Sequence, residues 1–567
     1  IIQLSAFASV SNGQIVKGGD GTLNLLGDNS NYKGSLRLEK GFLGITDNSN
    51  LGNVELNRPL ALKNGTLSFL AGMNLDRPLQ IINVGNDLVN LDTGANIVTL
   101  SSQISGNNGY LTKIGDGTLI LTSNNLEYNG IFGLVSGILS IQNDRNLGAL
   151  NKPLLLSAGT LQLTSNMILN RPFEIISAEN EQVNLDTGNN TVTLNGQISG
   201  ETGLVKKQGD LGTLILTGDN SGYTGSLILA AGTLSIQNDK NLGDPSSVKP
   251  IILEKGTLKF TADVISNRTF ETAGNPNIGV TIDTGPHAVT FTNGLQGDKF
   301  LIKEGIGSLN LSKLQNNNEV YISQGTINLL GNATVGSKFT VDTNGILSGT
   351  GRITQDVFNS EGTVVPGSNT TPGTLTIDGS YKQNNGILRV NITPEGTASL
   401  LDVIGAVTIE GKAILQIIAK PGTYNVGQVF EIIKSNEGIT GDFSEAILAG
   451  GPFTSGSGYY LDPVKEEGDN QSILKLILRY LTPSSNEADK NEATQGLQAE
   501  ILASNDITRI HYQEIGDILR KQISDNIENE KCSAFAAYAP QARYEMKMLE
   551  KLHEQSTYAS ALQQIDI

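Results

Sequence analysis

The feature that most constrains this chain is internal repetition at a step of about 95 residues. The string GDGTLNLLGDNSNYKG begins at Gly19, and close copies of it begin at Gly115 and Gly209. A shorter fourth copy, GIGSLNL, begins at Gly305. The string LDTGANIVTL, which begins at Leu91, recurs at the same step. The chain therefore contains three full repeats and a partial fourth, over residues 1 to about 335.

Within each repeat, apolar and polar residues alternate over four to six positions between short runs of Gly, Asn and Asp, as in Gly65-Thr66-Leu67. This alternation is the signature of a strand, and Gly and Asn tolerate the positive φ of tight turns. Strands this short and numerous bury their inner faces best when they stack in a coil. We therefore expect an all-β, right-handed parallel β-helix, with about four rungs of roughly 24 residues in each long repeat.

The chain divides into three predicted segments. Residues 1–335 form the repeated β-helix, and residues 336–481 continue it as a C-terminal β-helix region in which alternation persists to Tyr480. After Pro483, apolar residues recur at helical spacing, so residues 482–567 are predicted to be a linker with α-helix over 486–567. We expect residues 333–480 to be the stable folding nucleus, which is a hypothesis.

Composition excludes several classes of protein. The formal net charge is −17 and the acidic residues are spread along the chain, so a basic face for nucleic acid is not expected. No apolar run approaches the ~18–20 residues that span a bilayer. The single cysteine, Cys532, excludes an intrachain disulfide. The first residues resemble neither a signal peptide nor a complete N-terminus, so we expect the chain to begin inside a longer protein.

Several spaced strings resemble the autotransporter family of type V secretion. The unit GDGTLxLxxxNxYxG, followed by GxLxI, is similar to the autotransporter-associated β-strand repeat. The strings at 348–351, 366–367 and 372–381 resemble the C-terminal third of such passengers, and Gly438–Ser444 resembles the segment that closes them. The long repeats, rich in Asn and Ile, also resemble those of the rickettsial surface antigens of the outer membrane protein A and B type.

The resemblance implies a passenger domain that is exported across the outer membrane and exposed outside the bacterial cell. It implies an adhesin or invasion factor that binds an unidentified host-cell surface protein. It also implies a C-terminal β-barrel translocator as a partner, which we expect beyond Ile567 because helices follow Tyr480. No cofactor, nucleic acid or small-molecule substrate is expected.

The most tempting catalytic string is Asp-Thr-Gly, at 92–94, 186–188 and 283–285. It resembles the string of aspartic proteases, whose chemistry needs two carboxylates about 3 Å apart. Copies four rungs apart would lie nearly 20 Å from each other at ~4.8 Å per rung. We therefore predict structural turns, in which Asp caps the turn and Gly takes a positive φ.

Other candidate residues have a simpler interpretation as structural residues. Gly411-Lys412 is followed by Ala413, so it is not a phosphate loop. The three histidines, His287, His511 and His553, lack metal-ligand spacing. Cys532 is expected to pack as a small side chain on a helix. No catalytic, cofactor-binding or metal-binding residue is predicted.

Asparagine and tyrosine recur at equivalent places, namely Asn29 with Tyr32, Tyr128, and Asn220 with Tyr223. These residues could form a row that binds a ligand, or a stack that covers the edge of the solenoid. We favour the structural role. Three functions stay open. The chain is an adhesin without catalysis, a self-associating surface coat, or a polysaccharide-processing enzyme, which would need a cleft with clustered carboxylates.

Overall fold

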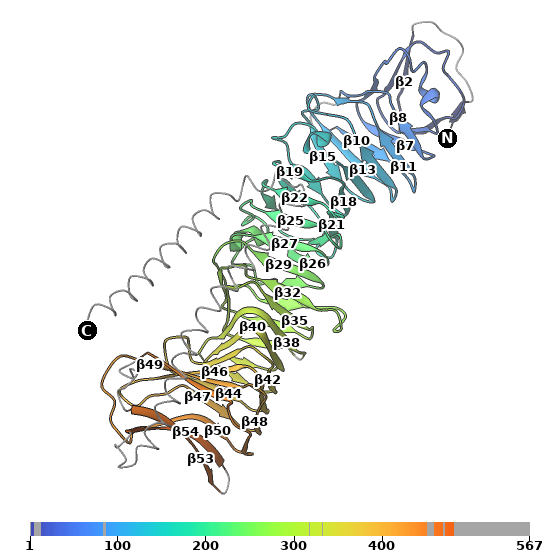
Figure 1. Ribbon diagram of the computed structural model, residues 1–567. Helices are drawn as coiled ribbons and strands as arrows, with labels where there is room; N and C mark the ends of the chain where they lie inside the picture. The colour runs from blue at the N-terminus through green and yellow to red at the C-terminus, as the bar shows by residue number, and fades with distance from the viewer. Residues whose placement is uncertain are drawn as a thin grey trace, which may run out of the picture. The chain divides into compact units, whose positions relative to one another are not determined.

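The computed structural model describes residues 2–4, 13–82, 87–316, 318–331, 333–450, 459–468 and 471–480. These residues form a solenoid of parallel strands with about 18 turns (Figure 1). The predicted all-β solenoid is confirmed. The predicted helical tail, with His511, Cys532 and His553, lies outside the described residues. The right hand of the coil stays a prediction from the crossover rule.

Each turn of the solenoid carries three strand positions, which we call faces 1, 2 and 3. Each strand pairs in parallel with the strand one turn away on the same face. Face 1 begins with β2 (Gln14–Lys17), β4 (Ser35–Leu38), β6 (Leu60–Leu62), β9 (Leu79–Ile81) and β12 (Ile104–Ser105). It continues with β19 (Met167–Leu169), β22 (Thr191–Leu194), β25 (Thr213–Leu216), β27 (Thr233–Ile236), β29 (Gly256–Phe260), β32 (Val280–Asp283), β35 (Leu301–Glu304), β42 (Val357–Asn359), β45 (Tyr381–Asn384), β48 (Val407–Glu410) and β51 (Ile439–Thr440).

Face 2 begins with β1 (Ile2–Leu4), β3 (Thr22–Leu25), β5 (Phe42–Ile45), β7 (Gly65–Phe69), β10 (Leu88–Asp92), β13 (Tyr110–Ile114), β15 (Ile131–Leu134), β17 (Leu154–Leu156), β20 (Phe173–Ile175) and β23 (Ile198–Ser199). It continues with β30 (Val264–Ser266), β33 (Ala288–Phe291), β36 (Ser308–Leu311), β43 (Thr363–Pro366), β46 (Ile387–Ile392), β49 (Ile414–Ala419) and β52 (Glu445–Gly450). The long strands β38 (Val320–Leu329) and β40 (Phe339–Gly349) pair on both face 1 and face 2.

Face 3 comprises β8 (Met73–Leu75), β11 (Ile97–Leu100), β14 (Thr118–Leu121), β16 (Ile138–Ile141), β18 (Gly159–Leu163), β21 (Gln182–Asp186), β24 (Leu204–Gln208), β26 (Ser226–Leu229), β28 (Ile251–Leu253), β31 (Phe270–Thr272), β34 (Leu295–Gly297), β37 (Leu314–Asn316), β39 (Thr334–Val335), β41 (Arg352–Ile353), β44 (Thr374–Ile377), β47 (Leu400–Val403) and β50 (Val429–Ser435). At its end, β54 (Gln471–Tyr480) pairs with β50 in the antiparallel sense, and β53 (Tyr459–Gly468) pairs with β54. This hairpin therefore covers the last parallel strand of face 3.

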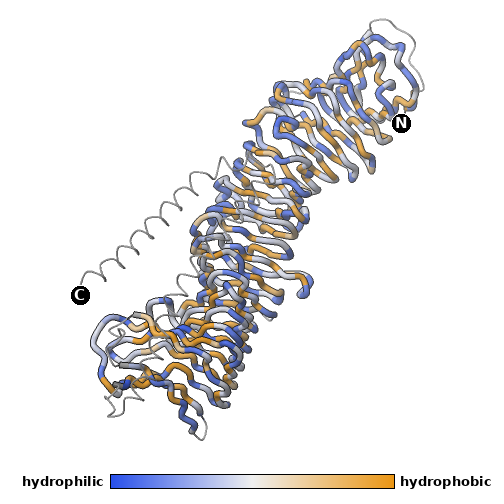
Figure 2. Tube along the Cα trace, viewed as in Figure 1, coloured by the Kyte–Doolittle hydropathy of each residue, from blue (hydrophilic) through white to orange (hydrophobic). Residues whose placement is uncertain are grey.

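The core is a set of aliphatic columns inside the coil. Leu67 on β7 is in register with Leu91 on β10, and both side chains are fully buried. Hydrophobic and hydrophilic residues alternate along each turn, as the tube in Figure 2 shows. Each fully buried Leu, Ile or Val contributes about 1.5–3 kcal/mol relative to an exposed one. Stacking of neighbouring turns thus supplies the stability that a coil of short strands requires.

Two loops in each repeat take the place of a strand. In the first repeat they are residues 26–34 and 46–59, in the second 122–130 and 142–153, and in the third 217–225 and 237–250. The second loop of each pair contains a single 3₁₀ turn: η1 (Asn48–Leu51), η2 (Asp144–Leu147) and η3 (Asp239–Leu242). Each turn is closed by a reciprocal capping box, such as the one between Asn143 and Asn146.

The number of turns in the long repeat is close to the predicted four, but it is not a whole number. One repeat has eleven strands, β2 to β12 for example, and two loops in strand positions. Thirteen positions on three faces make four and one-third turns. Accordingly, β7, β18 and β29 carry the same Gly-Thr-Leu string but lie on faces 2, 3 and 1. Each repeat therefore begins one face, or a third of a turn, away from the previous repeat.

Candidate functional site

The three Asp-Thr-Gly strings form turns, as predicted. Asp92 Oδ1 accepts a hydrogen bond from the amide of Gly94 at 2.9 Å, and the φ of Gly94 is 52°. The buried Thr93 hydroxyl donates to the carbonyl of Ile114 on the next turn at 3.4 Å. The other two copies repeat the Asp–Gly bond, between Asp186 and Gly188 at 2.9 Å and between Asp283 and Gly285 at 2.8 Å.

These turns are too far apart to form a catalytic dyad. Asp92, Asp186 and Asp283 end β10, β21 and β32, which lie on faces 2, 3 and 1. Consecutive copies are four and one-third turns apart, or about 20 Å along the axis at ~4.8 Å per turn. An aspartic dyad needs its two carboxylates about 3 Å apart. The strings therefore act as structural turns.

A buried lysine lies one turn away from each Asp-Thr-Gly turn, and we did not identify it from the sequence. Lys113 is in register with Leu91, so its aliphatic stem occupies an inward position in a column of leucines. Its Nζ donates to the carbonyls of Ile114 at 3.0 Å, Gly115 at 2.6 Å and Ser136 at 3.1 Å. The Nζ of Lys17 and of Lys303 has the same kind of cage, with one carbonyl from the next turn, that of Lys40 or Gln324. Lys207 Nζ also donates to three carbonyls, but all three, those of Gln208, Gly209 and Gly212, belong to its own turn. The ammonium groups of Lys17, Lys113 and Lys303 thus cross-link two neighbouring turns at a corner of the coil.

Burial changes the acid–base behaviour of these lysines. It lowers the pKa of Lys113, Lys207 and Lys303 to about 8, while nearby carboxylates, such as Asp92 beside Lys113, act in the opposite direction. A lowered pKa is one mark of a catalytic lysine. However, the Lys113 and Lys303 side chains are 0% exposed and Lys207 is 1% exposed. Because no substrate reaches these amines in the folded chain, we assign them a structural role.

The glycines that line the cage are required by its geometry. Gly137 has a φ of 73°, and a Cβ on it would lie 2.2 Å from the carbonyl oxygen of Gly115 and 2.7 Å from Lys113 Nζ. The sequence does contain a signal for the cage. A lysine stands two residues before the repeated glycine, on the inward side of an alternating strand, where an aliphatic residue is expected.

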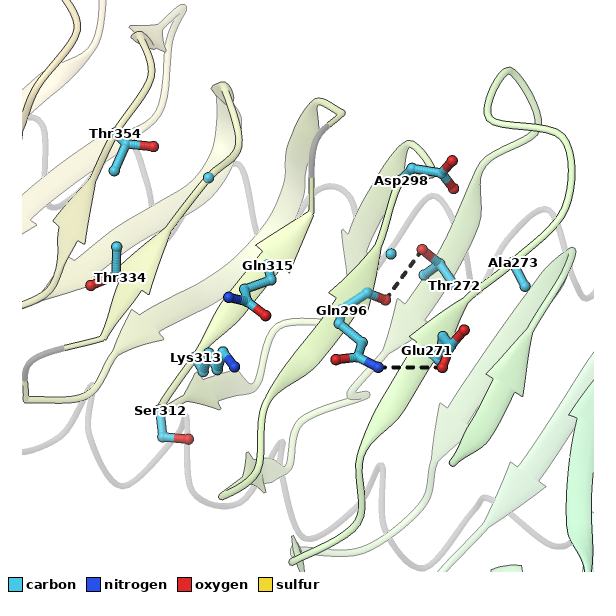
Figure 3. A pocket seen from close by; sticks show the side chains of 12 residues that line it. Glu271, Thr272, Ala273, Gln296, Asp298, Ser312, Lys313, Gln315, Thr334 and Thr354 are labelled. Carbon is cyan, nitrogen blue, oxygen red and sulfur yellow. Dashed lines mark hydrogen bonds between the residues drawn. The ribbon is translucent and has the colours of Figure 1, made fainter. Parts of the chain in front are cut away.

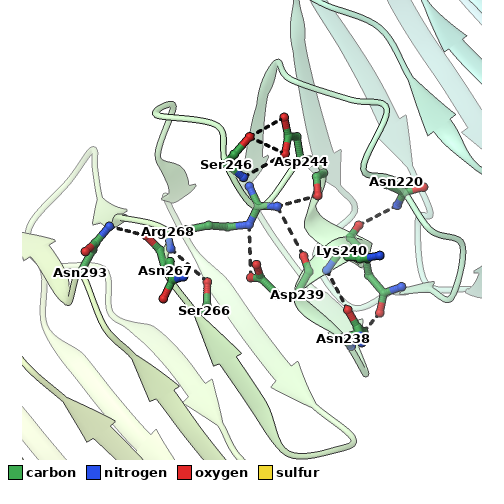
Figure 4. A network of polar contacts seen from close by, with 12 residues as sticks. Asn220, Asn238, Asp239, Lys240, Asp244, Ser246, Ser266, Asn267, Arg268 and Asn293 are labelled. Carbon is green, nitrogen blue, oxygen red and sulfur yellow. Dashed lines mark hydrogen bonds and ion pairs between the residues drawn. The ribbon is translucent and has the colours of Figure 1, made fainter.

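A buried arginine ties each 3₁₀ loop to the following turn. Arg171 is fully buried, and its Nε forms an ion pair with Asp144 at 2.5 Å. Its guanidinium also donates to the carbonyls of Leu147 at 3.1 Å and Gly148 at 3.0 Å. In the third repeat, Arg268 pairs with Asp239 at 3.2 Å, and Figure 4 shows this network. The arginine therefore replaces water as the partner of the loop's carbonyl groups.

The first repeat lacks the acidic partner of this arginine. Arg77 donates to the carbonyls of Arg58 at 3.0 Å and Gly52 at 2.9 Å. The position that corresponds to Asp144 holds Asn48. Within the described part of the chain, Arg77 Nε and Asn48 Oδ1 are buried without a hydrogen-bond partner. Burial lowers the pKa of Arg77, which is consistent with an incompletely compensated charge.

The repeated tyrosines have the structural role that we favoured, although they do not form a stack at the edge. Tyr128 is fully buried, and its hydroxyl donates to the carbonyls of Gly109 at 3.2 Å and Ile131 at 3.0 Å. Tyr32 and Tyr223 make the corresponding pairs of bonds. The three rings are 0–3% exposed and lie on three different faces, so a row of tyrosines that binds a ligand is excluded.

The repeated asparagines beside the tyrosines join adjacent turns. Asn125 Nδ2 donates to the carbonyl of Asn146 at 2.6 Å, and its Oδ1 accepts from the amide of Ile104 at 2.8 Å. Asn220 makes the same two bonds in the third repeat. Each asparagine therefore supplies backbone partners in a loop that has no strand ladder.

An open groove of about 1010 Å³ lies on face 3 (Figure 3). It crosses β31, β34, β37, β39 and β41, which are only two or three residues long. The small residues Ala273, Gly297 and Gly336 leave it shallow. Its polar lining comprises Glu271, Thr272, Gln296, Asp298, Ser312, Lys313, Gln315, Thr334 and Thr354. The groove can offer hydrogen bonds to an extended polar ligand.

The groove contains two carboxylates, which is the feature that the polysaccharide-processing alternative would require. Glu271 is hydrogen-bonded by Gln296 Nε2 at 3.3 Å, and Asp298 lies at the opposite side of the groove from Lys313 (Figure 3). A glycosidase needs one carboxylic acid with a raised pKa and a second carboxylate across the scissile bond.

The remaining candidates are structural in the described chain. Gly411 has a φ of 66° and, with Lys412, forms the turn between β48 and β49, where a phosphate loop would require a helix. His287 Nδ1 lies 3.5 Å from Asp263. Over the described residues, no group of three His, Cys, Asp or Glu side chains is arranged to hold a metal ion. In that same part of the chain, no helix is long and apolar enough to cross a membrane.

Comparison with known proteins identifies the repeat. Residues 15–45, 111–141 and 206–236 match the passenger-associated-transport-repeat family. Each match begins beside a caged lysine and includes the buried asparagine–tyrosine corner. The chain carries three passenger-associated-transport repeats on a parallel β-solenoid and is similar to autotransporter passengers. It is therefore a protein that is exported across the outer membrane and exposed at the cell surface.

Two curated relatives extend the similarity beyond the repeat. The passenger is 28% identical over 312 residues to the adhesin BmaC autotransporter of Brucella suis biovar 1 (strain 1330), which covers 48% of this chain and 8% of the relative. It is 26% identical over 405 residues to the uncharacterized protein YuaQ of Escherichia coli (strain K12), which covers 69% of this chain and 25% of the relative. The passenger thus spans a quarter or less of the length of these relatives. The narrower resemblance to rickettsial antigens stays a prediction.

Proposed function

We propose that this passenger is the binding region of an adhesin that attaches the bacterium to host cells and aids entry. The observation that carries the proposal is a solenoid whose outer surface is repeated on three faces, in a chain similar to a relative that is named an adhesin. A rod of this kind holds its binding surface away from the cell. Many copies per cell compensate for weak single contacts through avidity.

The proposed role needs no catalysis. Asp-Thr-Gly turns, caged lysines and buried tyrosines all have structural partners in the described chain, and none of them is exposed as a reactive group. The groove on face 3 offers polar contacts for binding. A polysaccharide-processing enzyme would lose turnover of its substrate on replacement of Glu271 and Asp298 by their amides, whereas the proposed role predicts no turnover by the wild-type chain either.

The proposed arrangement of the protein has three segments and two partners. Residues 1–335 and 336–481 form the repeated and the C-terminal parts of the β-helix, and residues 482–567 link them to a translocator barrel beyond Ile567. The first partner is this barrel and the second is a host-cell surface protein. The passenger match supports the barrel as a partner.

The second candidate function is a coat that self-associates on the bacterial surface. Its support is the repeated outer surface, which is presented in three directions and could contact neighbouring rods. This alternative requires contacts between copies of the passenger, whereas an adhesin binds its host partner as a monomer.

The deciding experiment measures binding of the purified chain to cultured epithelial cells beside its self-association by light scattering. Saturable binding by a monomer supports the adhesin. Ordered assembly without binding to cells would replace adhesion by surface coating as the function.

A further inference from the structure

Each repeat projects one short loop with the same pair of side chains, an exposed aliphatic one and a half-buried basic one. We call residues 52–59, 148–153 and 243–250 the knob loops. Each has an exposed aliphatic side chain, then a basic residue within two positions, then a proline. These pairs are Leu56 with Arg58, Leu150 with Lys152, and Val248 with Lys249. The aliphatic side chains are 45%, 37% and 95% exposed.

The knob loops are held rigidly from beneath by the buried arginines. Arg77 donates to the carbonyls of Gly52 and Arg58 at the two ends of the first knob loop. Arg171 donates to the carbonyl of Gly148 at 3.0 Å, and Arg268 donates to that of Gly243 at 2.6 Å. A loop that is already ordered loses little conformational entropy when it binds, so its contacts contribute more to affinity.

The knob loops point away from three different faces of the coil. Each knob loop occupies a strand position, and the strand one turn later on the same face is β8 on face 3, β19 on face 1 or β30 on face 2. The three buried arginines, which follow these strands, confirm the placement by bonding to the loops. The offset of one-third turn per repeat therefore distributes one feature of the repeat around the whole rod.

We propose that the three knob loops are equivalent contact sites for a protein partner, directed to three sides of the rod. The partner carries an apolar pocket for the aliphatic side chain and a carboxylate beside it for the basic side chain. This inference rests on the binding role proposed above and names the surface that performs it.

The chemistry of the loops selects this partner. An exposed aliphatic side chain on a rigid support gains free energy when it enters an apolar pocket, at about 25 cal/mol per Å² of surface buried. The neighbouring Arg or Lys pairs with a carboxylate at the rim, which fixes register and orientation. The net charge of −17 repels an acidic partner at long range. At physiological ionic strength this repulsion is screened beyond about 8 Å, so the local ion pair decides the contact.

The arrangement predicts how the three sites combine. A flat receptor-bearing surface faces one side of the rod, so one knob loop engages it at a time. The wild-type chain then has three independent sites and a variant with a single intact loop has one. The apparent affinity of wild type is therefore threefold higher. Sites on one side of the rod would instead bind together, and avidity would raise the affinity by about 10²–10⁴-fold.

The test uses the full chain and cultured epithelial cells as the probe. The variants are Leu56→Ser, Leu150→Ser and Val248→Ser, singly, in pairs and together. Matched controls are Ile97→Ser and Ile306→Ser, which remove aliphatic side chains that are 64% and 68% exposed and lie outside the knob loops and the strands stacked on them. Thermal unfolding of each variant establishes that the rod is intact, since substitutions of exposed side chains change stability little.

We expect each double variant to bind about threefold more weakly than wild type, the triple variant to bind at least tenfold more weakly, and the controls to bind like wild type. A triple variant that binds like wild type would refute the knob loops while leaving the adhesin in place. A tenfold loss from the first single substitution would refute their independence. A wild-type chain that does not bind cells would refute the adhesin itself. Self-association that the triple variant abolishes would make a second copy the partner and overturn the heterologous assignment.

Discussion

The unequal partners of the buried arginines provide a sharp test of what holds the long loops in place. Asp144→Asn in the second repeat copies the natural residue of the first repeat, Asn48. Arg171 would keep its bonds to the loop carbonyls but would lose the charge of its partner at 2.5 Å. The substitution conserves volume, but Asp144 Oδ2 also accepts from the amide of Asn170 at 3.0 Å. The change therefore removes the charge of the ion pair together with one acceptor oxygen.

The magnitude follows from burial of the pair, with 0% of the Arg171 side chain and 6% of the Asp144 side chain exposed. Removal of one partner of a buried pair costs about 3–5 kcal/mol when the remaining charge is uncompensated. Asn retains an acceptor oxygen, so the expected loss is nearer the ~1.5–3 kcal/mol of a charge-assisted hydrogen bond. We take about 2 kcal/mol, which is a roughly 30-fold change in an opening equilibrium at ~1.4 kcal/mol per tenfold.

The reciprocal change, Asn48→Asp, gives Arg77 the carboxylate that it lacks. The expected gain is smaller, about 1 kcal/mol or fivefold, because the new carboxylate must be desolvated as it pairs. The control is Asp219→Asn, since Asp219 pairs with Lys240 at 3.4 Å and both side chains are more than half exposed. An exposed pair contributes about 0–1 kcal/mol, so this variant should change little.

Hydrogen exchange is the appropriate assay because a solenoid opens locally and does not unfold in one step. The amides of Ala149 and Lys152 report on the second loop through their bonds to the carbonyls of Tyr128 and Ala149. We expect about 30-fold faster exchange there in Asp144→Asn, and about fivefold slower exchange over residues 47–59 in Asn48→Asp. Unchanged exchange in both variants would show that the carbonyl bonds alone fix the loops, and the reasoning about the ion pair would be wrong.

Three further predictions concern the caged lysines, the glycines and the C-terminal turns. The pKa of Lys113 is about 8 in the folded chain and 10.5 in the unfolded chain. The unfolded chain therefore binds more protons between pH 8 and 10, so stability should rise with pH by about 1–3 kcal/mol per cage. Thermal melting of Lys113→Met should show a smaller dependence of stability on pH. Gly137→Ala should cost more than 2 kcal/mol in chemical unfolding, whereas Gly21→Ala, which meets nothing within 4 Å, should cost less than 1. Deletion of residues 333–480 should abolish the yield of folded repeats, and a normal yield would exclude this region as the folding nucleus.

The sequence predicted the local structure of this passenger well. The Asp-Thr-Gly turn followed from the residue types alone, because Asp92 caps the turn and Gly94 has a positive φ, as such residues do elsewhere. The inward columns followed from alternation, as at Leu67 and Leu91. These are properties of neighbouring residues, so a single chain reveals them.

The position of each repeat around the coil could not be obtained in the same way. A loop such as 46–59 occupies a strand position without alternating like a strand, so the sequence alone does not show how many strand positions a repeat contains. The buried charges were missed for a different reason. Lys113 and Arg171 look like surface residues by type, and their interior positions appear only when the carbonyls of adjacent turns are in place. The knob loops likewise can be recognised as sites on three sides of the rod only when the face of each loop is known.

The offset of one-third turn per repeat has a consequence for how such a gene can change. Recombination between equivalent positions of two repeats deletes or duplicates about 95 codons. Local contacts survive, because each repeat meets a neighbour that resembles the one it lost. Everything on one side of the junction is nevertheless rotated by 120° about the rod relative to the other side, and only a change of three repeats restores the original orientation. Repeat number therefore sets the direction in which distal surfaces point, so a single recombination event can redirect a binding surface without altering any of its residues.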